Sequence, residues 1–336
     1  MKPTFAWHFA HQHSLITRRQ ALASGIDADA LRKLLRTGDW VAVRRGVYTT
    51  RVHWESLDVY VGRPRLEVWA AVLVTKSFHS ISHDSSAYLQ GLPILEATPR
   101  LVHVTRVGHL GGRTRHGIKH HQAPVEPEQI MFVDGHPVLD LPRTVADIGR
   151  EHGMRHGIVA ASSALRAGVT RKAMSAAIEP MTHWPYVTAA RTAIALADGR
   201  CENPGEALVK LMLEQLALGV VHPQFGVQEG GRVAWVDFRV GRHLIEFDGR
   251  FKYLRESDGG YADRRPEDVV WEEKRRQDWL CGFKTGMSRV VWDEVQEGTW
   301  DKTMARLHRE ITDTHARFGT SIDDLAPYVI RRARRS

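Results

Sequence analysis

Residues 231–249 have the sequence GRVAWVDFRVGRHLIEFDG, and this stretch decides the fold of the C-terminal part of the chain. Two apolar runs, each typical of a short strand, are separated by a Gly-Arg-His triplet, which predicts a hairpin. Asp237 lies in the first run, and Glu246 and Asp248 lie two residues apart in the second, where alternate side chains share a face. The hairpin would therefore bring three carboxylates to one side of a sheet.

Three carboxylates in an apolar frame predict a metal site. Crowded acids repel one another and lose hydration among apolar side chains unless a cation binds. Such oxygen-rich sites suit Mg²⁺, for which Mn²⁺ is expected to substitute, and a bound metal would activate water against a phosphate. Two structural alternatives stay open, because Asp237 could be a charge at a strand edge and Asp248-Gly249 could be a hairpin turn.

The segments around the hairpin predict a mixed α/β domain. A helix is expected after Asn203, a good N-cap, with Pro204 at its first position and Glu206 three residues after the cap. Glu206 would be a fourth acid at the site or, alternatively, only part of a capping box. A long charged helix is expected over 266–281, and the run that ends at Trp292 is typical of a strand.

This order of elements resembles the PD-(D/E)xK nuclease superfamily, and within it the branch related to very-short-patch repair endonucleases. The residues that carry the resemblance, over about 202–295, are NPGE, Pro223-Gln224, WVDF, IEFDGRFKY, EEKRRQDWLCGF and RVVW. The resemblance implies a mixed sheet flanked by helices. It also implies that Asp237 and Glu246 are the metal-binding acids and that Glu206 is the helix acid.

The sequence departs from the superfamily pattern at Asp248, which stands where a lysine is usual. Members of the very-short-patch-related branch similarly carry an acid followed by glycine in this strand. Lys252, or Lys274 on the long helix, would then supply the missing ammonium, and the identity of the general base stays open. The expected metal ligands are Asp237, Glu246 and Asp248. The full catalytic set adds Glu206 and Lys252.

The N-terminal segment predicts a winged helix-turn-helix. Thr17 is a good N-cap for a first helix, a second helix is expected over 27–36, and the alternation in residues 40–48, WVAVRRGVY, predicts two short strands with an Arg-Arg-Gly tip. Such a domain places its second helix in the major groove of DNA. The residues expected to contact DNA are Arg32, Lys33, Arg36, Arg44 and Arg45. The alternative is a domain that docks a protein.

The same segment resembles AbiEi-type antitoxins, the repressor halves of certain bacterial toxin–antitoxin pairs. The matching residues are LITRRQALASGIDADALRKLLRTGDWVAVRRGVY at 15–48 and SHDSSAYLQGLP at 82–93. The resemblance implies that the winged helix binds operator DNA. It leaves two protein partners open, a cognate toxin and a second copy of the chain.

The middle of the chain predicts helices with some strand, such as the RLVHVTRV run from Arg100, and shows no catalytic constellation. Its histidines include two pairs at i, i+4, His79 with His83 and His116 with His120, a spacing that can bind a metal on a helix. No acidic or cysteine partner was recognised for either pair, and HGIKHH is more typical of an exposed strand or loop. We therefore interpret these histidines as core or solvated residues.

Composition narrows the class of partner and compartment. The 336 residues carry 47 Lys+Arg against 39 Asp+Glu, a formal net charge of +8, which favours an anionic partner. No apolar stretch is long enough to span a bilayer, and no secretory signal is evident. Two cysteines, Cys201 and Cys281, favour a reducing compartment. We therefore expect a cytoplasmic protein with no membrane partner.

These features together predict an α/β multidomain protein. The expected parts are a winged helix-turn-helix at 1–60, an α-rich linking domain at 61–198, a PD-(D/E)xK nuclease-like domain at 199–311 and a basic tail at 312–336. The leading interpretation is a Mg²⁺-dependent endodeoxyribonuclease that binds double-stranded DNA, in phage defence or a toxin–antitoxin-related system. The alternatives are a non-catalytic repressor or antitoxin with an inactive nuclease fold, and an enzyme that acts on RNA.

Overall fold

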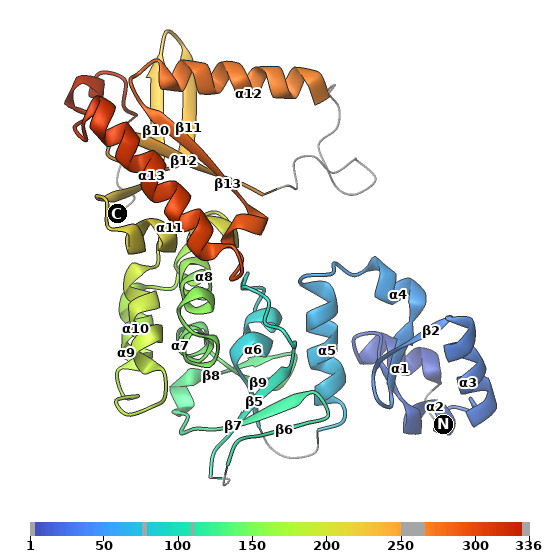
Figure 1. Ribbon diagram of the computed structural model, residues 1–336. Helices are drawn as coiled ribbons and strands as arrows, with labels where there is room; N and C mark the ends of the chain where they lie inside the picture. The colour runs from blue at the N-terminus through green and yellow to red at the C-terminus, as the bar shows by residue number, and fades with distance from the viewer. Residues whose placement is uncertain (1–3, 76–78, 109–110, 250–265, 331–336) are drawn as a thin grey trace. The chain divides into compact units, whose positions relative to one another are not determined.

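The chain is a multidomain α/β protein with mixed sheets. The computed structural model describes residues 4–75, 79–108, 111–249 and 266–330, and for 266–270 it describes the backbone alone. Two compact units divide the chain, Met1–Ala160 with Val169–Arg191 and Ala161–Gly168 with Thr192–Ser336. Figure 1 colours the chain from blue at the N-terminus to red at the C-terminus. Among the described helices, none has both the length and the hydrophobicity needed to cross a membrane.

The N-terminal segment folds as a helix-turn-helix followed by a hairpin. Its elements are α1 (Phe5–His11), β1 (Ile16–Thr17), α2 (Arg18–Ala23), α3 (Ala28–Thr37), β2 (Trp40–Arg44) and β3 (Val47–Thr50). Thr17 caps α2 in a capping box with Gln20, and Asp27 caps α3. Gly38, with a φ of 81°, ends α3 in the left-handed conformation that glycine tolerates. The predicted order of elements is therefore confirmed, and the strands lie in the order β1-β3-β2.

A six-stranded mixed sheet forms the middle of the chain. Its strands are β4 (Ser80–Ile81), β5 (Val102–Arg106), β6 (Arg113–Arg115), β7 (Ile118–Gln122), β8 (Ile130–Val133) and β9 (His136–Leu139). They lie in the order β6-β7-β5-β4-β9-β8, and β5 pairs in parallel with β7, as β4 does with β9. The strand predicted from Arg100 is β5. The region therefore holds more strand than the α-rich domain that the sequence predicted.

Helices pack on this sheet, and α6 contacts α5, α7 and β5. The helices of the region are α4 (Arg51–Ser56), α5 (Gly62–Val72), α6 (His83–Leu89), α7 (Leu141–His152), α8 (Met154–Arg166), α9 (Arg171–Ile178) and α10 (Val187–Leu196). Leu15 and Val47 of the N-terminal segment share one apolar core with Leu66, Trp69 and Val104. One apolar core therefore crosses the boundary expected at residue 60, in addition to a core of the N-terminal segment alone.

The second unit is built on a four-stranded mixed sheet. Its main elements are α11 (Pro204–Leu216), β10 (Val221–Glu229), β11 (Arg232–Val240), β12 (His243–Asp248), α12 (Pro266–Cys281), β13 (Gly286–Val291) and α13 (Trp300–Phe318). The strands lie in the order β10-β11-β12-β13, with β12 and β13 parallel. The hairpin predicted over 231–249 is confirmed as β11 and β12. A Cβ at Gly205 in α11 would collide with the Phe247 ring, so this helix and β12 approach closely.

The expected basic tail begins inside α13 and continues as packed structure. Gln228 N donates to Tyr328 O at 2.8 Å, and Ile330 N donates to Gly226 O at 2.9 Å, so the chain returns to β10. The RRARRS run at 331–336 lies outside the described residues.

Candidate functional site

The exposed side of α3 carries the basic residues that the sequence assigned to DNA. Leu31 is buried, and Leu34 and Leu35 pack against the core of the N-terminal segment, so the opposite side of the helix faces solvent. Lys33 and Arg36 are exposed. Arg32 is exposed as well, and it forms an ion pair with Asp29 on the same helix, so it is partly neutralised. The Arg32 of this helix therefore offers less free charge than its two basic neighbours.

The two arginines at the tip of the wing lie in different environments. Arg45 is exposed. Arg44 Nη2 donates to His116 O at 2.8 Å, a carbonyl in the turn between β6 and β7, and burial lowers the pKa of Arg44. Arg44, expected to contact DNA, therefore fastens the wing to the turn. Local sequence cannot predict this contact, because Arg44 and His116 are far apart in the chain.

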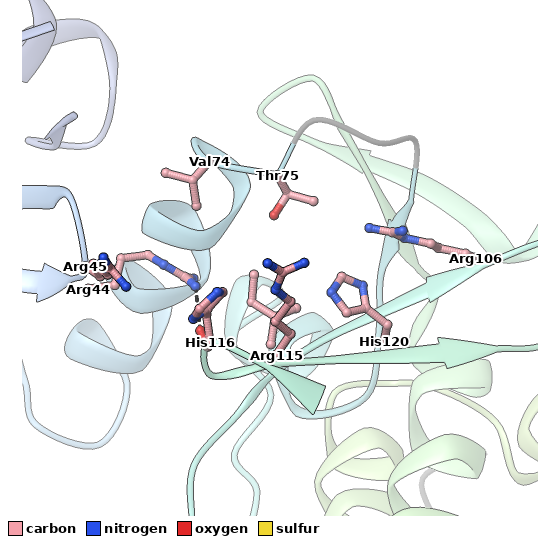
Figure 2. A pocket seen from close by; sticks show the side chains of 9 residues that line it. Arg44, Arg45, Val74, Thr75, Arg106, Arg115, His116 and His120 are labelled. Atoms are coloured by element: carbon pink, nitrogen blue, oxygen red, sulfur yellow. Dashed lines mark hydrogen bonds between the residues drawn. The ribbon is translucent and has the colours of Figure 1, made fainter. Parts of the chain in front are cut away.

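A basic pocket of about 390 Å³ lies behind the wing. Figure 2 shows Arg44 and Arg45 on one side, Arg106 on the other, and Arg115 and His120 between them. The remaining lining residues are Val74, Thr75, His116 and Ile118. Among the described residues that line this pocket, none is acidic.

Two polar atoms of the basic pocket's lining residues are buried without a hydrogen-bond partner among the described residues, Arg106 Nε and His120 Nδ1. Burial, followed by the charges of Arg106 and Arg113, lowers the pKa of His120. A concave surface of this charge suits an anion such as a phosphate. The sequence analysis did not identify Arg106 and Arg115 as site residues. The available signal was their position, because Arg106 lies in the strand predicted from Arg100 and Arg115 directly precedes the HGIKHH run.

In the second unit, Glu206 and Asp237 lie near each other. Glu206 is 5% exposed, and burial, together with the charge of Asp237, raises its pKa to about 7. Its carboxylate accepts from Glu202 N at 2.7 Å and from Asn203 Nδ2 at 2.6 Å. Asp237 Oδ2 accepts from Phe247 N at 2.7 Å. Asn203 caps α11 through Glu206 N, but the Glu206 carboxylate bonds to Glu202 N and to the Asn203 side chain, so the expected capping box is not formed. The same carboxylate lies near Asp237.

Glu246 and Asp248 lie against arginines instead. Glu246 Oε1 is 2.5 Å from Arg276 Nη2 on α12, and its other oxygen is 3.7 Å from Arg289 on β13. Asp248 is 3.9 Å from Arg289, which also pairs with Glu273 at 3.1 Å. The parallel register of β12 and β13 sets Glu246 opposite Arg289, a pairing that local sequence cannot predict.

The expected metal ligands have different partners in the structure. Asp237 lies near Glu206 and accepts from Phe247 N beside Glu246, whereas Glu246 and Asp248 take part in ion pairs. Among the described residues, the groups of three or more ligand atoms within 4.8 Å of one another contain none of these acids. Lys252 lies outside the described residues, and Lys274 is exposed on α12.

Neither of the histidine pairs considered in the sequence lies on a single helix. His79 precedes β4 and His83 begins α6, while His116 and His120 lie in the β6–β7 turn and in β7. His83 instead joins histidines from other elements in one of the groups whose ligand atoms lie within 4.8 Å. His83 is buried, as the interpretation of it as a core residue predicts, and the fold brings it beside His103 of β5 and His121 of β7.

Known proteins resemble the N-terminal segment. Residues 8–50 match a family model described as "Transcriptional regulator, AbiEi antitoxin". No curated protein matches the chain. The matched range contains α2, α3 and both strands of the wing, which are the elements that hold the exposed basic residues. Over residues 8–50, this chain is therefore similar to the transcriptional regulators of the AbiEi antitoxin family.

Proposed function

We propose that the chain is a regulator that binds duplex DNA through its N-terminal winged helix-turn-helix, in a toxin–antitoxin-related system. The observation that carries this proposal is the set of exposed cations on α3 and at the wing, Lys33, Arg36 and Arg45. The match of residues 8–50 to regulators described as AbiEi antitoxins supports the same function.

The positions of α3 and the wing fit the way in which winged helix-turn-helix domains usually contact DNA. A second helix of this kind enters the major groove, where its side chains reach base edges and phosphates, and the wing lies along the backbone. The basic pocket behind the wing extends this surface, since Arg106 and Arg115 would contact a phosphate beside Arg45. Arg44 would hold the wing in place through His116 O rather than contact DNA.

A salt-dependence experiment on the full chain tests the proposal. Binding to a short fluorescent duplex is measured by anisotropy, with DNA from immediately upstream of the chain's own gene compared with a scrambled duplex. The double variant Lys33→Ala/Arg36→Ala should lower the slope of log affinity against log salt by about 1.8, or 0.9 for each lost phosphate contact. Full-strength binding by this variant would contradict the proposal.

A matched control separates local contact from net charge. Lys302 and Arg309 are exposed on α13, and Lys302→Ala/Arg309→Ala removes the same two positive charges. This control should keep the wild-type slope. An equal loss in both double variants would mean that the overall charge of the chain, and not α3, drives binding.

Phosphodiester hydrolysis with Mg²⁺ is a second candidate function. One observation favours it: the charge of Asp237 contributes to the raised pKa of Glu206, so the two acids repel each other where a divalent cation would stabilise both. Two carboxylates are a sufficient protein contribution for Mg²⁺, which would supply Lewis-acid chemistry when bound. Asp237 and Glu206 would hold the ion, whereas Glu246 would first have to leave Arg276. Plasmid cleavage that requires Mg²⁺ and is abolished by EDTA tests this candidate.

A further inference from the structure

A cluster of imidazoles lies in the first unit, away from the proposed DNA surface on α3. We define the histidine cluster as His83, Asp84, His103, His121 and His152. His83 and Asp84 begin α6, His103 lies in β5, His121 lies in β7, and His152 is the last residue of α7. The parallel pairing of β5 and β7, together with the packing of α6 on β5, brings these residues together.

Three of the rings lie close enough together for one nitrogen of each to bind the same metal ion. His103 Nδ1 is 2.9 Å from His121 Nε2, and the rings of His83 and His121 stack with centroids 3.8 Å apart. One ligand atom from each of His83, His103 and His121 lies within 4.8 Å of the others. Two nitrogens bound to a tetrahedral zinc at 2.0–2.1 Å lie roughly 3.3 Å apart, so little movement is needed.

The neighbours of the cluster orient its rings as metal ligands require. His103 directs Nδ1 toward His121, and its Nε2 is 4.0 Å from Asp84 Oδ2 on the other side. His83 Nδ1 forms a hydrogen bond with Ser82 Oγ at 2.9 Å, so Nε2 is the nitrogen of this ring that would bind a metal. Histidine ligands commonly use the second nitrogen to bind a carboxylate or another polar group, and this fixes the tautomer.

Backbone strain and burial support the same conclusion. His83 has a φ of 52°, an uncommon conformation for a residue that is not glycine, and such conformations gather at functional sites. His83 and His103 are buried, and burial lowers the pKa of both and lowers that of His121 to about 3. Strain and burial of this kind are more typical of a built site than of solvated histidines.

A pocket of about 300 Å³ opens onto two of the three rings. His83 and His121 line it together with Lys119, Arg150, Glu151, Pro185 and Tyr186. Three protein nitrogens and an accessible fourth position are the arrangement of zinc sites that bind water or a small ligand. Lys119 is paired with Glu151, and Arg150 is paired with Asp147 at 3.4 Å, so the charges at the rim of this pocket are balanced within the protein.

We propose that His83, His103 and His121 bind one Zn²⁺, with Asp84 as the residue that positions His103 and the fourth coordination position open to the pocket. A second group, Asp84 with His103 and His152, also lies within 4.8 Å. We favour the three histidines because Asp84 is already bonded to His152 Nε2 at 2.9 Å. The pocket, moreover, opens on His83 and His121.

Zinc binding by the full-length protein tests the proposal. The chain is stripped with EDTA, dialysed, and titrated with Zn²⁺ alone by calorimetry, and bound metal is then counted by mass spectrometry. Wild type should bind one Zn²⁺ per chain, and Co²⁺ should give the intense visible absorption of a tetrahedral site. Failure of the wild type to bind either ion in a saturable 1:1 manner would overturn the proposal, whatever the variants do.

Variants then identify the ligands. His121→Ala should weaken Zn²⁺ binding by more than about a hundredfold, and Asp84→Asn by about 10–100-fold, as expected for an outer partner. His120→Ala is the matched control, because His120 is the next residue in β7 and lines the basic pocket instead. It should bind Zn²⁺ as wild type does. Loss of zinc in His152→Ala with full binding in folded His121→Ala would overturn the assignment of the ligands.

Discussion

The two groups of candidate metal ligands in this chain differ in how their charge is balanced. On the hairpin of the second unit, Glu246 and Asp248 have arginines from α12 and β13 beside them. In the histidine cluster, burial lowers the pKa of His83, His103 and His121, so neutral rings rather than charged acids would supply the ligand atoms. An acid that already has an arginine beside it gains less from an added cation than an acid that lies near another acid. Glu206 and Asp237 are such a pair, since the charge of Asp237 contributes to the raised pKa of Glu206.

The largest effect is expected at Asp237, which lies near another acid, and it is compared with the effect at Asp248, which lies near an arginine. If the second unit cleaves DNA with Mg²⁺, Asp237→Asn should reduce the cleavage rate by about a hundredfold or more, because a lost metal ligand removes several kcal/mol of transition-state stabilisation. The asparagine keeps an oxygen that can accept from Phe247 N. Plasmid nicking at saturating Mg²⁺ measures the rate.

Two further variants sharpen this test. Asp248→Asn should lose less than Asp237→Asn, since Arg289 already lies beside Asp248. Lys302→Ala, on α13, should cleave like wild type. Equal cleavage by folded Asp237→Asn and wild type, or no Mg²⁺-dependent cleavage by wild type, would remove the nuclease candidate.

The next effect is a pH dependence of opposite sign in the two regions. The pKa of Glu206 is raised by burial and by Asp237 to about 7, so its contribution to stability is full below its ordinary value of 4.5 and is lost as pH rises through 7. The loss amounts to about 3 kcal/mol. Histidines of the cluster have lowered pKa values, so their contribution is full above 6.5 and is lost as pH falls.

Urea unfolding of wild type and Glu206→Gln between pH 4.5 and 8 measures the Glu206 contribution as a difference, in which the histidine contributions cancel. Glutamine retains a carbonyl oxygen for the hydrogen bond from Glu202 N. The difference should move in favour of the variant as pH rises. A difference that is constant over this range would show that Glu206 titrates normally.

The smallest effect tests whether Arg289 balances the charge of the hairpin acids as a bound metal ion would. Arg289→Ala leaves Asp248 and Glu273 without this partner and should lower the free energy of unfolding by about 1 kcal/mol, a modest value because the side chain is 34% exposed. Saturating Mg²⁺ should then restore the melting temperature of the variant more than that of wild type. Arg309→Ala, an exposed substitution, should show neither effect. An identical Mg²⁺ response in Arg289→Ala and wild type would contradict the comparison.

Local signals predicted the parts of this fold that local interactions determine. The caps Thr17, Asp27 and Asn203 begin helices as expected, because each side-chain oxygen satisfies an amide of its own first turn. The hairpin of β11 and β12 followed from two apolar runs and a short turn. In the middle region, strands of two to five residues carry too little alternation to be predicted, and this is why five of the six strands were not assigned firmly there.

Which residues meet at each of the two candidate metal sites depends on contacts between segments that are remote in the sequence. Arg289 meets Glu246 because β13 lies parallel to β12, and His121 meets His103 because β7 lies parallel to β5. Parallel neighbours need long connections, so their register leaves no short-range pattern in the sequence. Helical spacing therefore pairs His83 with His79, whereas the fold places His83 beside His103 and His121.

The bond from Arg44 to His116 O has a consequence for the rate at which DNA would be released. A hairpin tip that is already held before binding loses little conformational freedom when it meets a backbone. Pre-ordering of this kind generally lengthens the lifetime of a complex more than it speeds its formation. On the proposed DNA, the β6–β7 turn would therefore slow dissociation by holding the wing in its bound position.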